Sequence, residues 1–148
     1  ERLRTDPRVR IMDRTNARYL TADSFEETIQ VVTMDLSFIS ARLVLPAVRG
    51  FLSPEGWVMV LVKPQFEIGK GLVGKGGVVR DPADHCGVLD SFVEWASETW
   101  TVQGIEPSPI RGKNGNIEFL AYLKPGGGPS EMDVVEIVKR AHESDLSE

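Results

Sequence analysis

Residues 57–64 read Trp-Val-Met-Val-Leu-Val-Lys-Pro, and residues 29–36 read Ile-Gln-Val-Val-Thr-Met-Asp-Leu. Short apolar runs rich in β-branched residues are typical of strands that are buried on both faces of a sheet. We expect the earlier run to end at Asp35 and the later one at Lys63. Open parallel sheets bind ligands at the carboxyl ends of their strands, so these two residues are candidates for a functional site.

The segments that follow these runs have the apolar spacing of helices. One helix is expected over residues 39–52, with Ser37 as its N-cap and a kink at Pro46. Another should begin at Asp81-Pro82, which read as an N-cap and a first helical residue. Strands alternating with helices predict an α/β fold with a mostly parallel sheet.

The remaining segments complete the predicted sheet and its surroundings. Residues 101–110 and 116–123 read as strands with no helix between them, which predicts an antiparallel pair at one edge. A further strand is expected at 8–13 and a turn at 53–56. A linker rich in proline and glycine then leads to a C-terminal helix that Ser130 would cap.

Composition and charge limit the classes of protein to which the chain can belong. The net charge is −5, but residues 125–148 carry six acidic and two basic side chains, so residues 1–124 carry only −1 and can still hold a local basic patch. No apolar run reaches the roughly 18 residues of a membrane span. One cysteine, Cys86, fits a reducing compartment, and His85 and His142 lack metal-ligand spacing. We therefore expect a cytoplasmic protein without a membrane span or metal site.

Three ionisable residues could carry chemistry. Asp35 closes an apolar strand, either as a helix cap or as an acceptor at a ligand crevice. Lys63 follows six apolar residues and precedes Pro64, so it either reaches solvent or exchanges a proton with a substrate hydroxyl. Glu118 lies in the last strand, where side-chain alternation leaves it facing solvent unless it pairs with Lys63.

A glycine-rich loop at residues 69–76 (GKGLVGKG) nearly matches the phosphate-binding pattern GxxxxGK[ST]. Gly76 stands where Ser or Thr must bind magnesium, and no helix follows at once, so we reject a nucleoside triphosphatase. The loop is either a flexible surface loop or a contact for the phosphates of a nucleic-acid backbone. Basic residues of this loop and of the loop before the last strand are the candidates for RNA binding: Lys70, Lys75, Arg80, Arg111 and Lys113.

Five collinear motifs resemble those of one known family. They are RTNAR at 14–18, DLSFIS at 35–40, VKPQFE at 62–67, GKGGVVRDP at 74–82 and GNIEF at 115–119. Together they resemble the TlyA family, bacterial proteins also called hemolysin A, which have an FtsJ-like catalytic domain. The resemblance reaches to about Lys124 and implies a Rossmann-like, S-adenosylmethionine-dependent methyltransferase fold. It divides the chain into a partial methyltransferase domain at 1–124 and a linker with a C-terminal helix at 125–148.

The resemblance also implies a reaction, in which S-adenosylmethionine methylates a ribose 2′-hydroxyl of ribosomal RNA in a ribosomal subunit. The last three members of the family's Lys-Asp-Lys-Glu catalytic set match Asp35, Lys63 and Glu118. The first lysine, the glycine-rich donor loop and the first strands would lie before Glu1. We therefore expect an incomplete catalytic domain with unpaired sheet edges. The implied donor contacts that remain are Thr15, Asn16, Ala17, Asp35 and Leu36.

Residues 35–38, Asp-Leu-Ser-Phe, also bear on the type of acceptor. They differ from the Asn/Asp-Pro-Pro-Tyr/Phe motif of methyltransferases that act on exocyclic amines, which favours an oxygen acceptor. Two other functions stay open: a non-catalytic module that docks on the ribosome through its basic loop, and a membrane-active hemolysin. The hemolysin lacks support, because the sequence has neither an apolar span nor a basic amphipathic helix. Unpaired sheet edges would also favour a homo-oligomer.

Overall fold

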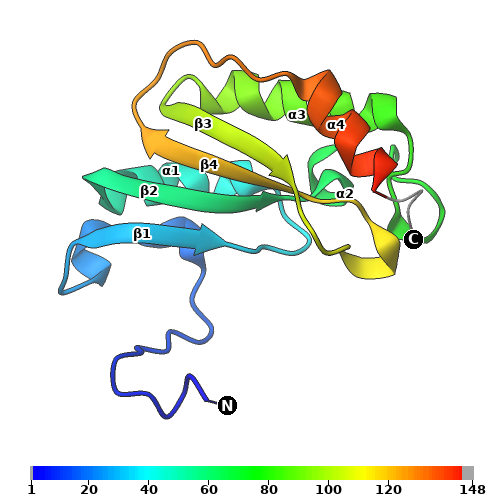
Figure 1. Ribbon diagram of the computed structural model, residues 1–148. Coiled ribbons are helices and arrows are strands. Elements are labelled where there is room, and N and C mark those ends of the chain that lie inside the picture. Colours follow the sequence, from blue (N-terminus) through cyan, green and yellow to red (C-terminus); the bar gives the residue numbers. More distant parts are fainter. Residues whose placement is uncertain (1, 145–148) are drawn as a thin grey trace.

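A computed structural model describes residues 2–144 and shows one mixed sheet with helices packed against it (Figure 1). The strand order is β1-β2-β4-β3. β1 (Ile29–Met34) pairs in parallel with β2 (Leu52–Val62). β4 (Phe119–Pro125) pairs antiparallel with both β2 and β3 (Trp100–Pro107). The predicted α/β fold and the antiparallel edge pair of β3 and β4 are therefore confirmed. The described sheet is mixed rather than mostly parallel, because β4 also pairs antiparallel with β2 and only β1 and β2 run parallel.

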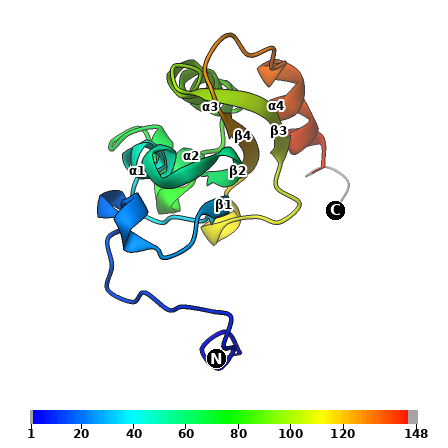
Figure 2. The ribbon, with the colours of Figure 1, turned by 90° about the vertical axis from the view of Figure 1, so that its left-hand side faces the viewer.

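Helices cover the sheet on more than one side. In Figure 2, α1 (Leu45–Phe51) and α2 (Pro64–Glu67) lie to the left of the strands and α4 (Val134–Glu143) lies to the right. The long helix α3 (Pro82–Ala96) packs against α4, which also lies along β3. Within residues 2–144, no helix has the length and apolar character that crossing a bilayer requires. Single 3₁₀ turns occur at Ala17–Tyr19, Ala22–Ser24, Ala41–Leu43, Lys75–Gly77 and Lys113–Gly115.

β1 is an exposed edge strand, so the prediction that it is buried on both faces was wrong. Val31 is 47% exposed, and Met34 alone in this strand is fully buried. The β-branched run suits a strand, but a strand with one neighbouring strand is covered only where other elements reach it. The strand predicted at 8–13 is also wrong, because that segment runs as turns and irregular backbone.

Residues 53–56 stay within β2 instead of forming the predicted turn. Between Ile29 and Val31 of β1, the partner residue on β2 jumps from Leu52 to Trp57. The four intervening residues are therefore accommodated as an irregularity in the ladder. The residues at 53–56 that predicted a turn therefore form a bulge in β2. Glycine and proline within a strand commonly mark bulges.

The predicted start of α3 is confirmed, whereas the predicted kink is not. The side chain of Asp81 accepts a hydrogen bond of 2.9 Å from the backbone N–H of Ala83, and Pro82 is the first helical residue. Pro46 lies in the first turn of α1, where its missing N–H leaves no helical hydrogen bond unmade. Proline thus begins this helix instead of bending a longer one.

Two predicted helix caps are wrong, each by three residues. Ser40, rather than Ser37, caps the 3₁₀ turn before α1 by accepting from the N–H of Arg42. Asp133, rather than Ser130, caps α4. In both cases the sequence offers two capping side chains close together, and the direction from which the chain approaches the helix selects one of them.

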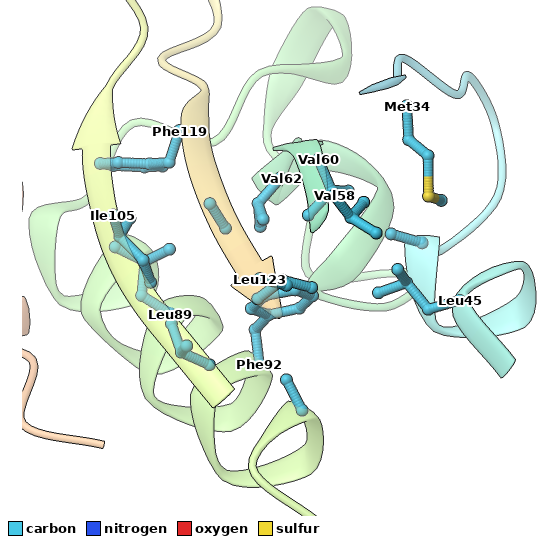
Figure 3. Packing of buried hydrophobic residues seen from close by; sticks show 14 of the residues in the cluster. Met34, Leu45, Val58, Val60, Val62, Leu89, Phe92, Ile105, Phe119 and Leu123 are labelled. Carbon is cyan, nitrogen blue, oxygen red and sulfur yellow. The ribbon is translucent and has the colours of Figure 1, made fainter. Parts of the chain in front are cut away.

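The hydrophobic core joins the sheet to α1, α3 and α4. Figure 3 shows the part of the core between the sheet, α1 and α3. The alternate residues Val58, Val60 and Val62 of β2 are fully buried, and so are Leu89 and Phe92 of α3. α4 belongs to the same core, although the sequence placed it outside the methyltransferase domain. Residues 145–148 of that predicted terminal segment lie outside the described part of the chain. The buried residues of α4 are Val134, Ile137, Val138 and Ala141.

Candidate active site

The carboxyl ends of β1 and β2 bring Lys63 and Asp35 into contact. The Nζ of Lys63 lies 2.6 Å from Oδ1 of Asp35, and their side chains are 12% and 73% exposed. β2 ends at Val62 and Pro64 opens α2 directly, which fixes the place where the lysine stem leaves the sheet. The pair therefore combines a lysine enclosed by protein with a carboxylate that remains open to a ligand.

Aromatic rings flank the lysine amine. Its Nζ lies 5.8 Å from the ring centre of Phe66, which in turn lies 5.3 Å from the ring centre of Phe38. Phe38 is 78% exposed and has a φ of +68°, a left-handed conformation that bulky residues rarely adopt. Backbone strain of this kind concentrates at functional sites. In the sequence, Phe38 stood out only as part of the DLSFIS motif. Its position three residues after Asp35 could have indicated that it lies near the site.

The antiparallel pairing of β2 with β4 carries Glu118 to the same edge of the sheet. The register ends with Val62 opposite Phe119, so Lys63 and Glu118 are the next residues on the two neighbouring chains. The Glu118 side chain is buried and accepts a hydrogen bond of 2.7 Å from Nε2 of Gln65. The alternative in which Glu118 faces solvent is therefore wrong. Its immediate partner is an amide, while the amine of Lys63 contacts Asp35.

Gln65 and Gly112 enclose the Glu118 carboxylate, and neither residue stood out in the sequence. Oε1 of Gln65 is buried without a hydrogen-bond partner among the described residues, so the charged acceptor on Nε2 fixes the orientation of the amide. The backbone at Gly112 passes so close that a Cβ there would overlap the carboxylate. A buried carboxylate is costly without donors, so Gln65 serves stability as well as geometry.

A second buried carboxylate, Glu67, joins α2 to the segment that follows β1. It accepts hydrogen bonds from Oγ of Ser40 at 2.6 Å and from the backbone N–H of Ala41 at 2.8 Å. Burial raises the pKa of Glu67, while these two hydrogen bonds and the nearby charge of Arg42 act in the opposite direction. These hydrogen bonds hold the segment after Asp35 against the segment after Lys63, the two residues that form the ion pair.

A buried side-chain amide holds the glycine-rich loop. Oδ1 of Asn116 accepts from the N–H of Val79 at 3.0 Å, and its Nδ2 donates to the carbonyl of Gly77 at 2.9 Å. Asn114 adds a bond of 2.9 Å from Nδ2 to the carbonyl of Gly76. Asn116 is almost wholly buried. Residues 76–79, where the glycine-rich loop ends, are therefore tied to the segment before β4 by three side-chain hydrogen bonds.

The basic residues expected to bind RNA surround this loop. Lys70, Lys75 and Lys113 are exposed, and Nη1 of Arg80 donates to the carbonyl of Lys75 at 3.2 Å. Arg80 and Arg111 line one pocket of about 320 Å³. Lys113 lines a smaller pocket of about 130 Å³ beside the aromatic pair. The structure thus gathers three of the five residues at two neighbouring hollows.

The residues expected to bind the methyl donor lie on two segments. Asp35 is exposed, whereas Leu36 is half-buried and packs against the core. Thr15 and Asn16 are exposed, and Oδ1 of Asn16 accepts a backbone N–H of the 3₁₀ turn that begins at Ala17. A contact of Asn16 with both a donor and an acceptor on an adenine edge would therefore use the second lone pair of that oxygen.

The two histidines, far apart in the sequence, meet in the structure. Nδ1 of His85 lies 2.8 Å from Nε2 of His142, and Nε2 of His85 lies 3.0 Å from the carbonyl oxygen of Val79. A carbonyl only accepts, so Nε2 of His85 carries a proton and its Nδ1 accepts from His142. Burial, followed by the proximity of His142, lowers the pKa of His85. Across residues 2–144, no group of three or more His, Cys, Asp or Glu side chains could hold a metal ion.

Known proteins resemble this chain over most of its length. The chain is 44% identical over 151 residues to YqxC of Bacillus subtilis, named as a candidate rRNA methyltransferase. It is 45% identical over 123 residues to the 16S/23S rRNA (cytidine-2′-O)-methyltransferase TlyA of Mycobacterium tuberculosis. The matches cover 97% and 82% of this chain but 54% and 46% of those proteins. The chain therefore spans about half the length of these curated relatives.

A solved structure of a candidate hemolysin from Streptococcus thermophilus resembles the fold closely. Its TM-score is 0.92 at 39% sequence identity, and the match covers 99% of this chain and 55% of that one. The family description of FtsJ-like methyltransferases matches residues 1–125, which include every strand and the sheet edge with Lys63 and Asp35. The chain belongs to the FtsJ-like methyltransferase family.

Proposed function

We propose that this chain supplies the catalytic residues of an S-adenosylmethionine-dependent enzyme that methylates a ribose 2′-hydroxyl of ribosomal RNA. The observation that carries the proposal is the enclosed Lys63 amine, which contacts an open carboxylate and an aromatic ring at the ends of two parallel strands. The name of the M. tuberculosis relative supports ribose as the acceptor. A substrate in the ribosome would place the activity in the cytoplasm.

The proposed step forms a bond between the ribose oxygen and a methyl carbon while the bond from that carbon to sulfur breaks. S-adenosylmethionine supplies the methyl group on a sulfonium. Lys63 binds the ribose hydroxyl through Nζ and takes up its proton. Asp35 holds the amine in place, and Glu118 adds negative charge at the same edge. We expect alignment of the reacting atoms to supply most of the rate gain.

The pocket of about 130 Å³ beside Phe38 offers a place for the target nucleotide. Phe38 and Phe66 form part of its wall, and the ring centre of Phe66 lies 5.8 Å from the lysine amine. A base that stacks on an aromatic side chain gains roughly 1–3 kcal/mol without regard to sequence. An exposed phenylalanine in this position would therefore hold an unpaired base while its ribose reaches Lys63.

The residues present fit part of a donor such as S-adenosylmethionine. The exposed carboxylate of Asp35 can accept hydrogen bonds from an amine or a hydroxyl, and the exposed side chains of Thr15 and Asn16 can both donate and accept. Asp35 would then serve both the lysine and the donor. Its substitution should weaken donor binding as well as transfer.

Single-turnover methyl transfer to ribosomal RNA, measured with the full-length protein, tests the proposal. Lys63→Ala should lower the rate by about 10²–10⁴-fold, because it removes the group that accepts the proton. The matched control is Lys124→Ala, which removes an amine that lies 5.9 Å from the ring centre of Tyr122. The control should react like the wild type. RNA binding should survive both substitutions.

Two outcomes would contradict the proposal. Transfer by Lys63→Ala at the wild-type rate would remove Lys63 from the chemistry. If the wild type and Lys63→Ala both bind ribosomal RNA and neither transfers a methyl group, the non-catalytic docking module is favoured.

A further inference from the structure

A second pocket adjoins the one beside Phe38, since Asn114 lines both. Its volume is about 320 Å³, and three elements form it: the end of the glycine-rich loop, the 111–117 segment and α4. Among the described residues, its ionisable lining side chains are Arg80, Arg111 and His142, none of which is acidic. We call it the basic pocket.

The walls of the basic pocket are fixed before any ligand arrives. The backbone at Val79 is bound by the buried amide of Asn116, and the guanidinium of Arg80 is bound to a carbonyl of its own loop. His142 is bound through Nε2 to the buried ring of His85. A ligand would therefore meet preformed groups, and less ordering lowers the free-energy cost of binding.

The hydrogen-bond chain assigns a distinct role to the second nitrogen of His142. Because Nε2 donates to His85, Nδ1 carries no proton in the neutral ring and can only accept. The groups that face this ring are His85 of α3, the two arginines of the pocket and, in an adjoining hollow, Cys86, Lys139 and Glu143.

We propose that the basic pocket binds a backbone phosphate of the RNA strand that presents the target nucleotide. Arg80 and Arg111 supply permanent charge. This inference rests on the proposed function, which supplies the RNA. An RNA strand whose base lies beside Phe38 must continue along the protein surface. The basic pocket adjoins the pocket beside Phe38, because Asn114 lines both. The planar guanidinium groups suit phosphate oxygens, and the contact would position the strand without reading its sequence.

The salt dependence of RNA binding by the full-length protein tests the inference. Arg80→Gln and Arg111→Gln should each weaken binding about tenfold, as expected for loss of one charged hydrogen bond. Each should also lower the slope of log K against log salt concentration by about 0.7, the value for one phosphate of a single strand. Lys139→Gln removes the same charge from α4 outside the pocket and should leave the slope unchanged.

A conservative substitution adds a measurement that a merely structural role would not affect. Arg111→Lys, which keeps the charge, should recover most of the affinity that Arg111→Gln loses. Thermal unfolding of each variant identifies any that fail to fold. If Arg111→Gln fails to fold, the salt slope of Arg80→Gln still tests the inference.

The outcomes separate this inference from the proposed function. Wild-type salt slopes in both arginine variants, with methyl transfer intact, would overturn the inference alone. Lowered slopes in a protein that transfers no methyl group would overturn the proposed function and leave the phosphate site standing. Binding of inorganic phosphate can be followed by the NMR signals of His142. If that binding is saturable and is lost in Arg80→Gln, while the salt slopes of RNA binding do not change, the pocket binds free anions rather than RNA. That result would also overturn the inference.

Discussion

Two irregular regions of this chain are held in opposite ways. The segment before β1 has an exposed ion pair between Arg4 and Asp13, whose side chains are both about 60% exposed. The glycine-rich loop, which looks more mobile in the sequence, is bound by the buried amide of Asn116. Exposed ion pairs contribute little because water competes for both charges, whereas breaking a buried polar contact leaves groups without partners. Burial of the partner, rather than the glycine content, decides which region is fixed.

The largest effect is expected from Asn116→Ala. The substitution leaves the N–H of Val79 and the carbonyls of Gly77 and Lys113 without their buried partner. The free energy of unfolding should fall by about 2–4 kcal/mol in urea titrations, the range for loss of a buried network.

Asn114→Gly is the matched control for that prediction. It removes one exposed amide contact and tolerates the φ of +58° at this position. It should cost less than about 1 kcal/mol. Equal costs for the two substitutions would show that the loop is not held by its buried amide.

A somewhat smaller effect is expected from Gln65→Leu. The Glu118 carboxylate would lose the hydrogen bond from Nε2 and stay enclosed without it. We expect a loss of roughly 1–3 kcal/mol in the free energy of unfolding. Gln65→Glu should be worse at pH 7 than at pH 5, because it places a second carboxylate against the first. A pH-independent cost for Gln65→Glu would mean that the two side chains are farther apart than the structure has them.

The buried histidine should make stability depend on pH. The pKa of His85 is lowered in the folded protein, by burial first and then by His142, so the unfolded chain binds the proton more readily. Stability should therefore fall as the pH drops below about 6.5, the ordinary value for histidine, with a slope no steeper than about 1.4 kcal/mol per pH unit. Denaturant titrations between pH 7.5 and 5 measure it. His85→Phe should flatten the curve, and an unchanged slope would assign the effect to other groups.

Glu67 should act with the opposite sign in more acidic solution. Its pKa is raised in the folded protein, chiefly by burial, so the folded state takes up the proton first as the pH falls. Its contribution to stability should therefore increase as the pH falls toward 4.5, the ordinary pKa of an unburied glutamate.

The smallest effect is expected at the amino-terminal segment. Arg4→Ala should change the free energy of unfolding by less than about 0.5 kcal/mol, because the ion pair with Asp13 is open to water at both ends. Raising the salt concentration should leave the difference from the wild type within error. A cost above 1 kcal/mol would mean that this segment is held as firmly as the loop.

Local signals explain what the sequence could predict. The apolar runs of β1 and β2 and the Asp81-Pro82 start of α3 depend on residues close together in the chain. The exposure of β1 depends on its neighbours in the sheet, which its own apolar run does not reveal; only the expectation of unpaired sheet edges pointed to it. The family motifs placed Asp35, Lys63 and Glu118 at one edge. The residues that hydrogen-bond to these three were not predicted, because the partners lie far apart in the chain. Gln65 and Glu118, for example, are separated by 53 residues.

The outer side of β1 has a consequence for how the protein behaves in concentrated solution. In the described chain its backbone pairs with β2 alone, and Val31 presents an apolar side chain to solvent. Unsatisfied N–H and C=O groups along such a margin form a template on which a further strand can add, from any source that offers an extended segment. Any segment that covers this margin would therefore also limit self-association.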